Sequence, residues 1–587
     1  MRRVGTALLV LAGLAALGRA SAVAQNLAHA QSIGTYTPPP AVAAKVGENP
    51  PPRIAEFGTI ANPVRLRPAA VDAREKLEAM EAWNRSGNEP PRAGFTRALP
   101  EAISARFDTT VNADSHSVRA RSAAGVTLWG TKVTVGDAHG IRLHLTGVVL
   151  PPGTKFWSYG TEGSPIEFGL ELRGPDGDLW TPITFGETAF LDVEVPTSDG
   201  EGRFSILEIA EIRSLAATTE PPCAIDAACA SSTDFPAIVE GRKAVALLEF
   251  MSGHGAGFCT GTLLNDTAQD GTPYLLTANH CISDQASAST LHALWDYDPP
   301  SCGGAVPALS SLQSSVGATL LATGATSDFC LMQLSSVPPG RSFLGWDARS
   351  SSLVPGTTIY RLSHPTSYLD VSHSPLPMEF AESLLNVPSE QCFAGQGADY
   401  FYSVISKGFE YYGSSGAAAL LGSGEVVGQL KGSCDVTTQQ FCAEQQQPPD
   451  LFDGAFTMTY PYVARWLDAP SPACVPDPTR LCLGSRFNVT AQWNKPDGTS
   501  GFGTAVSLTP DSGYFWFFDP SNVEIVTKVV GGCGINASYW VFASGLTNTG
   551  VTLTYVDLGS GEQQVYRSAA GTAFQPIQDT SAFATCP

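Results

Sequence analysis

Three short segments of the chain carry the side chains that acyl-transfer chemistry by a serine needs. YLLTANHCI places His280 directly before Cys281 at the end of an apolar run, and TSDFCLMQL places Asp328 at the head of another. In YYGSSGAAALL, Ser415 lies in a glycine-flanked turn. The chemistry requires a base, a carboxylate that orients the base, and backbone N–H donors for the oxyanion. We therefore predict catalytic roles for His280, Asp328 and Ser415, with the N–H groups of Gly413 and Ser415 as the oxyanion hole.

Each segment also has a simpler explanation. A histidine beside a cysteine can be half of a metal site or a structural residue, Asp328 can cap a strand, and the Gly-Ser-Ser-Gly stretch can be an ordinary turn. The sequence contains no Cys-x-x-Cys, no His-Glu-x-x-His and no EF-hand loop, so we expect no metal and no cofactor. Cys259 lies on the preceding apolar run, and a bridge to Cys281 would clamp the loop that carries His280.

Composition favours a β-rich protein of several domains. The chain has 587 residues, 43% of them hydrophobic, with 58 glycines and 43 prolines. This length allows about three or four domains, and the glycine and proline content is typical of loop-rich β structure. The net charge of −21 argues against a nucleic-acid partner, which would require a basic face.

The N-terminus has the pattern of a secretory signal peptide over residues 1–24. Two arginines precede a short apolar run that ends in small residues, and the run is too short to span a bilayer. No later segment has 18 uninterrupted apolar residues. We therefore expect a secreted, extracellular monomer without membrane attachment after cleavage. The 13 cysteines of such a chain should mostly form disulfides.

Changes of composition divide the rest of the chain. Residues 25–92 are rich in proline and alanine, with one helix expected near 70–83. Residues 93–217 show the period-two alternation of half-buried strands, as in FLDVEVP, and contain no cysteine. All 13 cysteines lie from Cys223 onward, which separates this cysteine-free domain from a disulfide-rich one over 218–470. The stretch Ala469-Pro470-Ser471-Pro472 marks the next boundary, before a C-terminal β-sandwich of unreadable role over 471–587.

The region from Cys223 to Pro470 resembles the chymotrypsin-fold, trypsin-like serine proteases, and more closely the secreted bacterial lysyl endopeptidases. The similarity is carried by CTGTLLN, YLLTANHC, WDYDPPSC, ATSDF, GWDAR, GSSG and VVGQLKGSC, and by the order His, Asp, Ser. It implies a mostly β chain with a double β-barrel protease domain. It also implies a serine endopeptidase that hydrolyses peptide bonds in protein or peptide substrates through an acyl-enzyme.

The resemblance also implies a disulfide pattern. The family pattern pairs Cys223 with Cys434, Cys229 with Cys302, and Cys259 with Cys281. Cys392 and Cys442 then remain as a fourth pair, and Cys330 as a buried free thiol. The four C-terminal cysteines, at 474, 482, 533 and 586, are expected to form two bridges among themselves.

Primary specificity is expected to depend on a carboxylate in the substrate pocket. Aligning GAFTMTY with the family places the pocket aspartate at Asp450, with Asp453 as a competitor, and the resemblance implies cleavage after lysine or arginine. Lys431 occupies a position where the relatives have histidine. A lysine there would cancel the attraction for basic side chains if it paired with Asp450.

The flanking β-rich region looks like the propeptide of such secreted proteases. A cysteine-free domain before a slow-folding, disulfide-rich β domain suits a folding chaperone and inhibitor, so we expect a zymogen cut between Leu215 and Cys223. Ser414 replaces the aspartate that trypsin-like zymogens use for activation, which argues against that switch. The alternative is a surface-binding protein in which the protease fold is a passive scaffold.

Overall fold

The computed structural model divides the chain into two compact units, Gln31–Leu467 and Asp468–Pro587, and each is described by itself. It describes residues 32–38, 59–67, 71–86, 89–107, 114–121, 126–196, 202–213, 219–253, 255–367, 374–386, 399–434, 450–468, 474, 476–484, 486–536, 538–558 and 562–585. The predicted signal peptide lies outside these residues, as do Cys392, Cys442 and Cys586.

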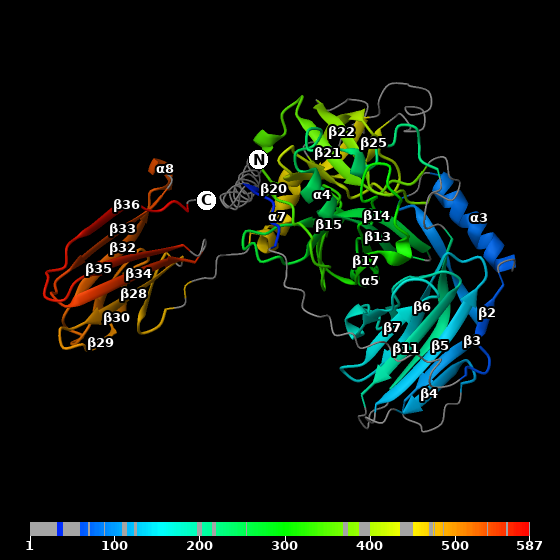
Figure 1. The fold of residues 1–587 in the computed structure, drawn as a ribbon, viewed down its shortest axis with the longest axis horizontal. Helices are drawn as coiled ribbons and strands as arrows, with labels where there is room; N and C mark the ends of the chain where they lie inside the picture. The colour runs from blue at the N-terminus through cyan, green and yellow to red at the C-terminus, as the bar shows by residue number, and fades with distance from the viewer. Residues whose placement is uncertain are drawn as a thin grey trace, which may run out of the picture. The chain divides into compact units, whose positions relative to one another are not determined.

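The first unit begins with a β-sandwich whose two sheets share one apolar core (Figure 1). Apolar residues alternate along its strands: Ile141, Leu143 and Leu145 are buried from one sheet, and Leu191 and Val193 from the other. One sheet contains β3 (Arg92–Arg106), β6 (Gly140–Val149), β9 (Leu179–Trp180), β10 (Thr184–Phe185) and β12 (Arg203–Ile212). The other contains β2 (Val64–Leu66), β4 (Ser117–Arg121), β5 (Thr127–Val135), β7 (Lys155–Tyr159), β8 (Ile166–Phe168) and β11 (Thr188–Val195).

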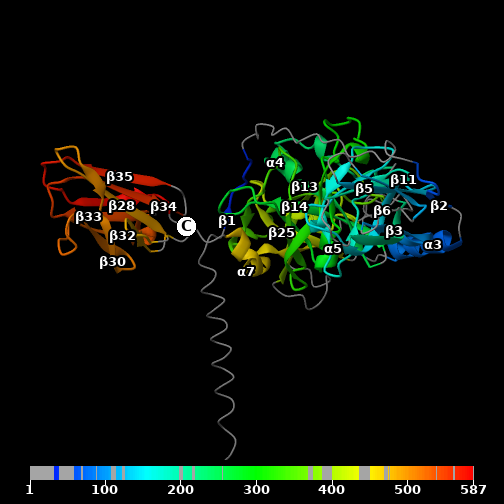
Figure 2. The ribbon, with the colours of Figure 1, turned by 90° about the horizontal axis from the view of Figure 1, so that it is seen from below.

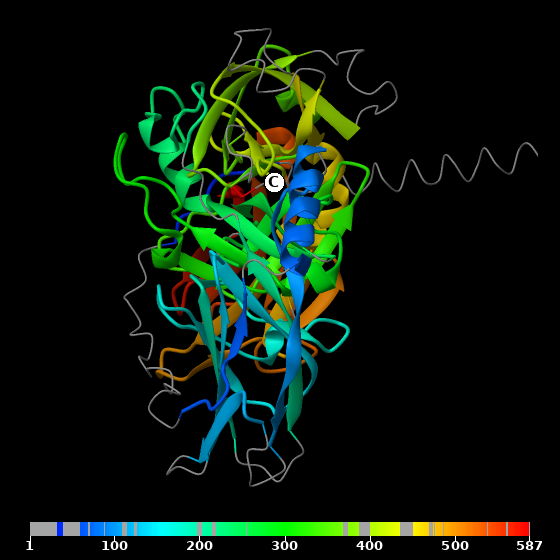
Figure 3. The same cartoon turned by 90° about the vertical axis from the view of Figure 1, so that its right-hand side faces the viewer.

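Helix α3 (Val71–Arg85) precedes β3, close to the span expected from the sequence. Figure 3 shows this blue helix beside the long blue strand. Asn84, at the end of the helix, makes two hydrogen bonds with the backbone of Arg92 at the start of β3. Its Nδ2 donates to the Arg92 carbonyl at 2.9 Å, and its Oδ1 accepts the Arg92 N–H at 2.8 Å. Trp83 Nε1 donates to the carbonyl of Pro90 at 3.0 Å. The short connection that carries Glu89 is therefore fixed on both sides.

The remainder of the unit has the double β-barrel fold expected from the sequence. The first half contains β13 (Val245–Ser252), β14 (Gly255–Leu264), β15 (Tyr274–Ala278), β16 (His292–Trp295), β17 (Gln313–Val316), β18 (Ala318–Gly324) and β19 (Phe329–Leu334). The second half is a closed ring, because β25 pairs with both β24 and β26; its strands are β21 (Thr358–Ser363), β22 (Glu379–Asn386), β23 (Tyr400–Lys407), β24 (Ala418–Leu420), β25 (Val426–Cys434) and β26 (Asp450–Ala455). Around the halves lie β1 (Ser32–Ile33), β20 (Trp346–Asp347), α4 (Ile238–Ala244), α5 (Gln285–Ser289) and α7 (Phe456–Leu467).

The β-sandwich and the first barrel half share one continuous sheet. Strand β3 pairs antiparallel with the start of β14, opposing Phe95 to Gly255 and Gly94 to Ala256. The far end of β14 pairs with β15. A side chain at Gly94 would collide with the carbonyl and Cα of the residues that face it on β12, so glycine permits the close approach of these strands. The sandwich thus docks by backbone hydrogen bonds beside the strand that leads to His280.

The second unit is a β-sandwich, as expected. Figure 2 shows its two sheets as separate layers. One contains β27 (Arg480–Leu483), β28 (Phe487–Asn494), β29 (Ser500–Phe502), β34 (Gly550–Asp557) and β35 (Gln563–Ser568). The other contains β30 (Thr504–Thr509), β31 (Ser512–Trp516), β32 (Ile525–Gly531), β33 (Tyr539–Gly545) and β36 (Ile577–Phe583), with α8 (Cys533–Asn536) between β32 and β33. The two inner faces bury one aromatic-rich core.

Candidate active site

His280 lies in the turn that follows β15. Leu275 and Leu276 of this strand are buried, and the chain turns directly after the strand ends at Ala278. A disulfide between Cys281 and Cys259 of β14 ties the turn to the neighbouring strand, with the two Cα atoms 6.3 Å apart. The imidazole therefore projects from a turn that is held covalently.

Asp328 stands at the head of β19, which pairs with β15. Its Oδ2 lies 2.6 Å from His280 Nδ1, and its Oδ1 accepts the backbone N–H of His280 at 3.0 Å. Its carbonyl also accepts the N–H of Asn279 at 2.8 Å. Asp328 adopts a left-handed backbone with φ of +53°, which is unusual for a non-glycine residue. A carboxylate at Nδ1 selects the tautomer that leaves Nε2 free to accept a proton.

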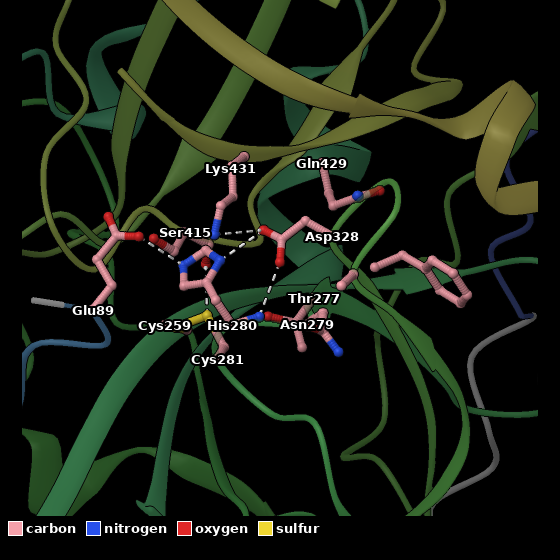
Figure 4. A network of polar contacts seen from close by, with 12 residues as sticks. Glu89, Cys259, Thr277, Asn279, His280, Cys281, Asp328, Ser415, Gln429 and Lys431 are labelled. Carbon is pink, nitrogen blue, oxygen red and sulfur yellow. Dashed lines mark hydrogen bonds and ion pairs between the residues drawn. A yellow bond between two sulfur atoms is a disulfide. The ribbon is translucent and has the colours of Figure 1, made fainter. Parts of the chain in front are cut away.

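Ser415 lies in the turn before β24, beside the His280 ring (Figure 4). Its carbonyl accepts the N–H of Thr260 at 3.0 Å, and Thr260 Oγ1 donates to the carbonyl of Gly413 at 2.9 Å. Gly413 has φ of +93°, and a Cβ there would meet the His364 carbonyl at 2.7 Å. The Ser414 N–H donates to Tyr411, whereas those of Gly413 and Ser415 donate to no acceptor among the described residues.

Lys431 adds a positive charge to this group. Its Nζ lies 3.5 Å from Asp328 Oδ2, and the side chain reaches the carboxylate from β25 (Figure 4). The sequence suggested Asp450 as a partner for Lys431. The ion pair that the structure describes is instead with Asp328, on the side of the carboxylate that also faces the imidazole.

Glu89 was not anticipated from the sequence. It comes from the connection before β3, and its Oε2 lies 3.1 Å from His280 Nε2 (Figure 4). Burial raises the pKa of the Glu89 carboxyl, an effect that the nearby charges of His280 and Lys431 oppose. The N-terminal β-sandwich thus supplies a carboxylate to the ring nitrogen that a catalytic base would use. No motif marks Glu89, because only the docking of β3 on β14 brings it there.

A cavity of about 110 Å³ opens beside Ser415. Two carboxylates line it, those of Glu89 and Glu410, together with Tyr411, Tyr412 and the apolar side chains of β25 and β26. Asp450 is not among the lining residues. Asp453, its predicted competitor, is fully buried and forms an ion pair with Arg361.

The structure contains two of the disulfides that the resemblance implies, Cys229–Cys302 and Cys259–Cys281. Cys223 and Cys434 are both disulfide-bonded, and their pairing with one another stays a prediction. In the second unit Cys474 bonds to Cys482, and Cys533 is also disulfide-bonded. Cys330 is a buried free thiol, as predicted, and burial raises its pKa.

Among the described residues, no group of three or more histidine, cysteine, aspartate or glutamate side chains is arranged to hold a metal ion. No helix in the described part of the chain is both long and apolar enough to cross a membrane.

Comparison with known proteins agrees with the resemblance seen in the sequence. Residues 219–452 match the family model for the lysyl endopeptidase C-terminal domain. A lysyl endopeptidase of Pseudomonas aeruginosa is 29% identical over 204 residues, which cover 32% of this chain and 43% of that protein. The chain thus spans less than half the length of this relative.

Two solved structures are similar to part of this chain at low sequence identity. One is the crystal structure of Deg5, with a TM-score of 0.26 and 10% identity over 40% of this chain and 94% of that one. The other is the thermostable serine protease AL20 from an extremophilic microorganism, with a TM-score of 0.26 and 12% identity over 39% of this chain and 98% of that one.

Proposed function

We propose that the chain is a secreted serine endopeptidase made as a zymogen. The observation that carries the proposal is the arrangement of His280, clamped by Asp328 through both its ring and its backbone N–H, beside Ser415 in a glycine turn. A merely structural histidine needs one hydrogen-bond partner. Asp328 binds this histidine at both its ring and its backbone, and the ring faces a serine. The match of residues 219–452 to the lysyl endopeptidase domain supports the same chemistry.

In the proposed mechanism Ser415 Oγ attacks the scissile carbonyl while His280 Nε2 takes its proton. Asp328 holds the Nδ1–H and stabilises the imidazolium. The N–H groups of Gly413 and Ser415 donate to the developing oxyanion, since they have no described acceptor in this structure. His280 then protonates the leaving amine, and water hydrolyses the acyl-enzyme by the reverse sequence of proton transfers.

The N-terminal β-sandwich is assigned the role of an inhibitory propeptide. Glu89 contacts His280 Nε2 and lines the cavity beside Ser415, so the site is occupied while the sandwich stays docked. A signal peptide over residues 1–24 would direct the chain to the secretory route, which suits a protein with several disulfides. Protein and peptide chains are the substrates, with cleavage after basic residues.

Labelling with a fluorophosphonate probe tests this function directly, because only an activated serine reacts. We expect the processed protein to be labelled at Ser415. Triad residues act as a unit, so Ser415→Ala should abolish labelling and lower peptide turnover about 10⁴-fold or more. Ser311→Ala, on the surface away from the site, is the control and should retain both. Absence of labelling in the processed wild-type protein would leave only the passive-scaffold alternative.

A further inference from the structure

We propose that Glu410 is the residue that sets primary specificity, and that its carboxylate receives the ammonium or guanidinium group of a substrate lysine or arginine. The inference rests on the proposed endopeptidase function and moves the specificity role from Asp450 to a residue that the resemblance does not mark. Two carboxylates line the cavity beside Ser415, those of Glu89 and Glu410, and only that of Glu410 belongs to the protease domain.

Glu410 belongs to the pocket by position. It lies five residues before Ser415 in the same loop, and it lines the cavity with Ser415 itself, Tyr411 and Tyr412. Only 2% of the residue is exposed. A side chain that enters this cavity from a scissile bond at Ser415 therefore meets Glu410 within the enclosed space.

Hydrogen bonds from neighbouring hydroxyls hold the Glu410 carboxylate in place. Ser363 Oγ donates to Oε2 at 2.8 Å, and the hydroxyl of Ser414 makes a further hydrogen bond with the carboxylate. Burial raises the pKa of Glu410 to about 7, with Arg361 acting in the opposite direction. A buried carboxyl held by neutral hydroxyls gains most from a cation, because an incoming charge offsets the desolvation cost of ionising it.

The other carboxylates near the site either form ion pairs within the protease domain or belong to the N-terminal β-sandwich. Asp453 is bound by Arg361, whose guanidinium also donates to Ser383 and Ser403. Asp328 is engaged by His280 and Lys431. Glu89 belongs to the N-terminal β-sandwich and leaves the site if the propeptide is released. Glu410 is then the acidic lining residue that remains in the protease domain.

The cavity walls suit the stem of a long basic side chain. Leu430 and Leu451 line it together with Tyr411 and Tyr412. Methylene groups can pack on such surfaces while the charged end stays with a polar partner, and aromatic faces attract cations. The pocket therefore combines apolar and aromatic walls with the buried acid Glu410 of the protease domain.

The test compares cleavage by the processed enzyme of peptides that differ only in having Lys, Arg, Gln or Leu before the scissile bond. Rates are expressed as kcat/KM per Ser415 labelled by the fluorophosphonate probe. Glu410→Gln keeps the shape and removes the charge, so we expect the Lys:Gln preference to fall on the order of 100-fold. Asp450→Asn is the competing variant and should change that preference by less than about threefold, while Glu410→Asp should restore part of it.

Two results would overturn the inference while leaving the proposed function intact. A labelled Glu410→Gln enzyme that loses activity equally on all four peptides would show that Glu410 only braces Ser414. Loss of the Lys preference in Asp450→Asn, with Glu410→Gln unaffected, would return the role to Asp450. Failure of the proposed function is distinct, because the processed wild-type protein would then take up no probe at Ser415.

Discussion

Glu89 is placed to couple the inhibited state to pH. Burial raises its pKa above the ordinary 4.5. The charges of His280 and Lys431 oppose this shift, and that of Asp328 adds to it. An acid with a higher pKa when docked holds its proton more tightly in the docked state, so raising the pH above about 4.5 favours undocking.

We therefore expect self-inhibition of the intact chain to weaken as pH rises. The measurement is the rate of Ser415 labelling in the intact chain divided by that in the processed enzyme, which removes the pH dependence of the labelling reaction itself. The ratio should rise with pH in the wild type. In Glu89→Gln it should be flat and stay near the low-pH wild-type value, because the neutral amide mimics the protonated acid that the docked state favours. Glu78→Gln, on the exposed face of α3, should behave as wild type. A wild-type ratio that falls with pH would contradict the assignment.

The site residues that the sequence predicts lie in local patterns, whereas those it misses depend on contacts between segments far apart in the chain. His280, Asp328 and Ser415 each sit in a local pattern, an apolar run or a glycine turn, that indicates its setting. Glu89 has no such pattern, and it reaches His280 only through the pairing of β3 with β14. Glu410 directly precedes the YYGSSG segment, but its burial and its hydrogen bonds to Ser363 and Ser414 depend on β21 and leave no pattern in the sequence.

At the scale of the element, the Cys259–Cys281 bridge holds the turn that carries His280 onto β14. Its removal frees a loop of 22 residues in the unfolded chain. We expect Cys259→Ala with Cys281→Ala to lower the free energy of unfolding by about 2–4 kcal/mol. The urea concentration at which activity is half lost should fall accordingly. The matched pair Cys474→Ala with Cys482→Ala lies in the other unit and should leave that midpoint unchanged.

Strands with one buried face are readable from the sequence, whereas their partners at a domain junction are not. The alternation in FLDVEVP predicts β11, and Leu191, Val193 and Val195 are all buried. Helix α3 also lies close to its expected span. The β3–β14 pairing uses backbone groups opposite Gly94 and Gly255, which leave no side-chain signature. The sequence therefore indicates two domains but not the sheet they share.

At the scale of the whole first unit, the β-sandwich buries charge as well as apolar surface against the protease fold. Arg142 of β6 pairs with Glu249 of β13 at 2.8 Å, and both side chains are almost fully buried. Arg142 also donates to the carbonyl of Thr290 at 2.5 Å. An apolar cluster crosses the same junction, with Ile183 and Ile212 on one side and Phe258 on the other. Separation would expose this surface and leave Glu249 without its buried partner.

Processing is therefore expected in two stages, a cut followed by slower release. Mass spectrometry of secreted protein should find a new N-terminus between Leu215 and Cys223, and the two fragments should still co-elute on gel filtration.

Arg142→Met should weaken the association of the two fragments by about 2–5 kcal/mol, because it leaves Glu249 buried in the interface without its ion-pair partner. Lys155→Met removes an exposed ion pair with Glu167 and a cation–π contact with Trp157, both within the sandwich, and should leave the association unchanged. A fully active secreted enzyme that keeps residues 25–215 covalently attached would contradict the propeptide role. Equal co-elution of the wild type and Arg142→Met would show instead that the buried pair does not hold the sandwich in place.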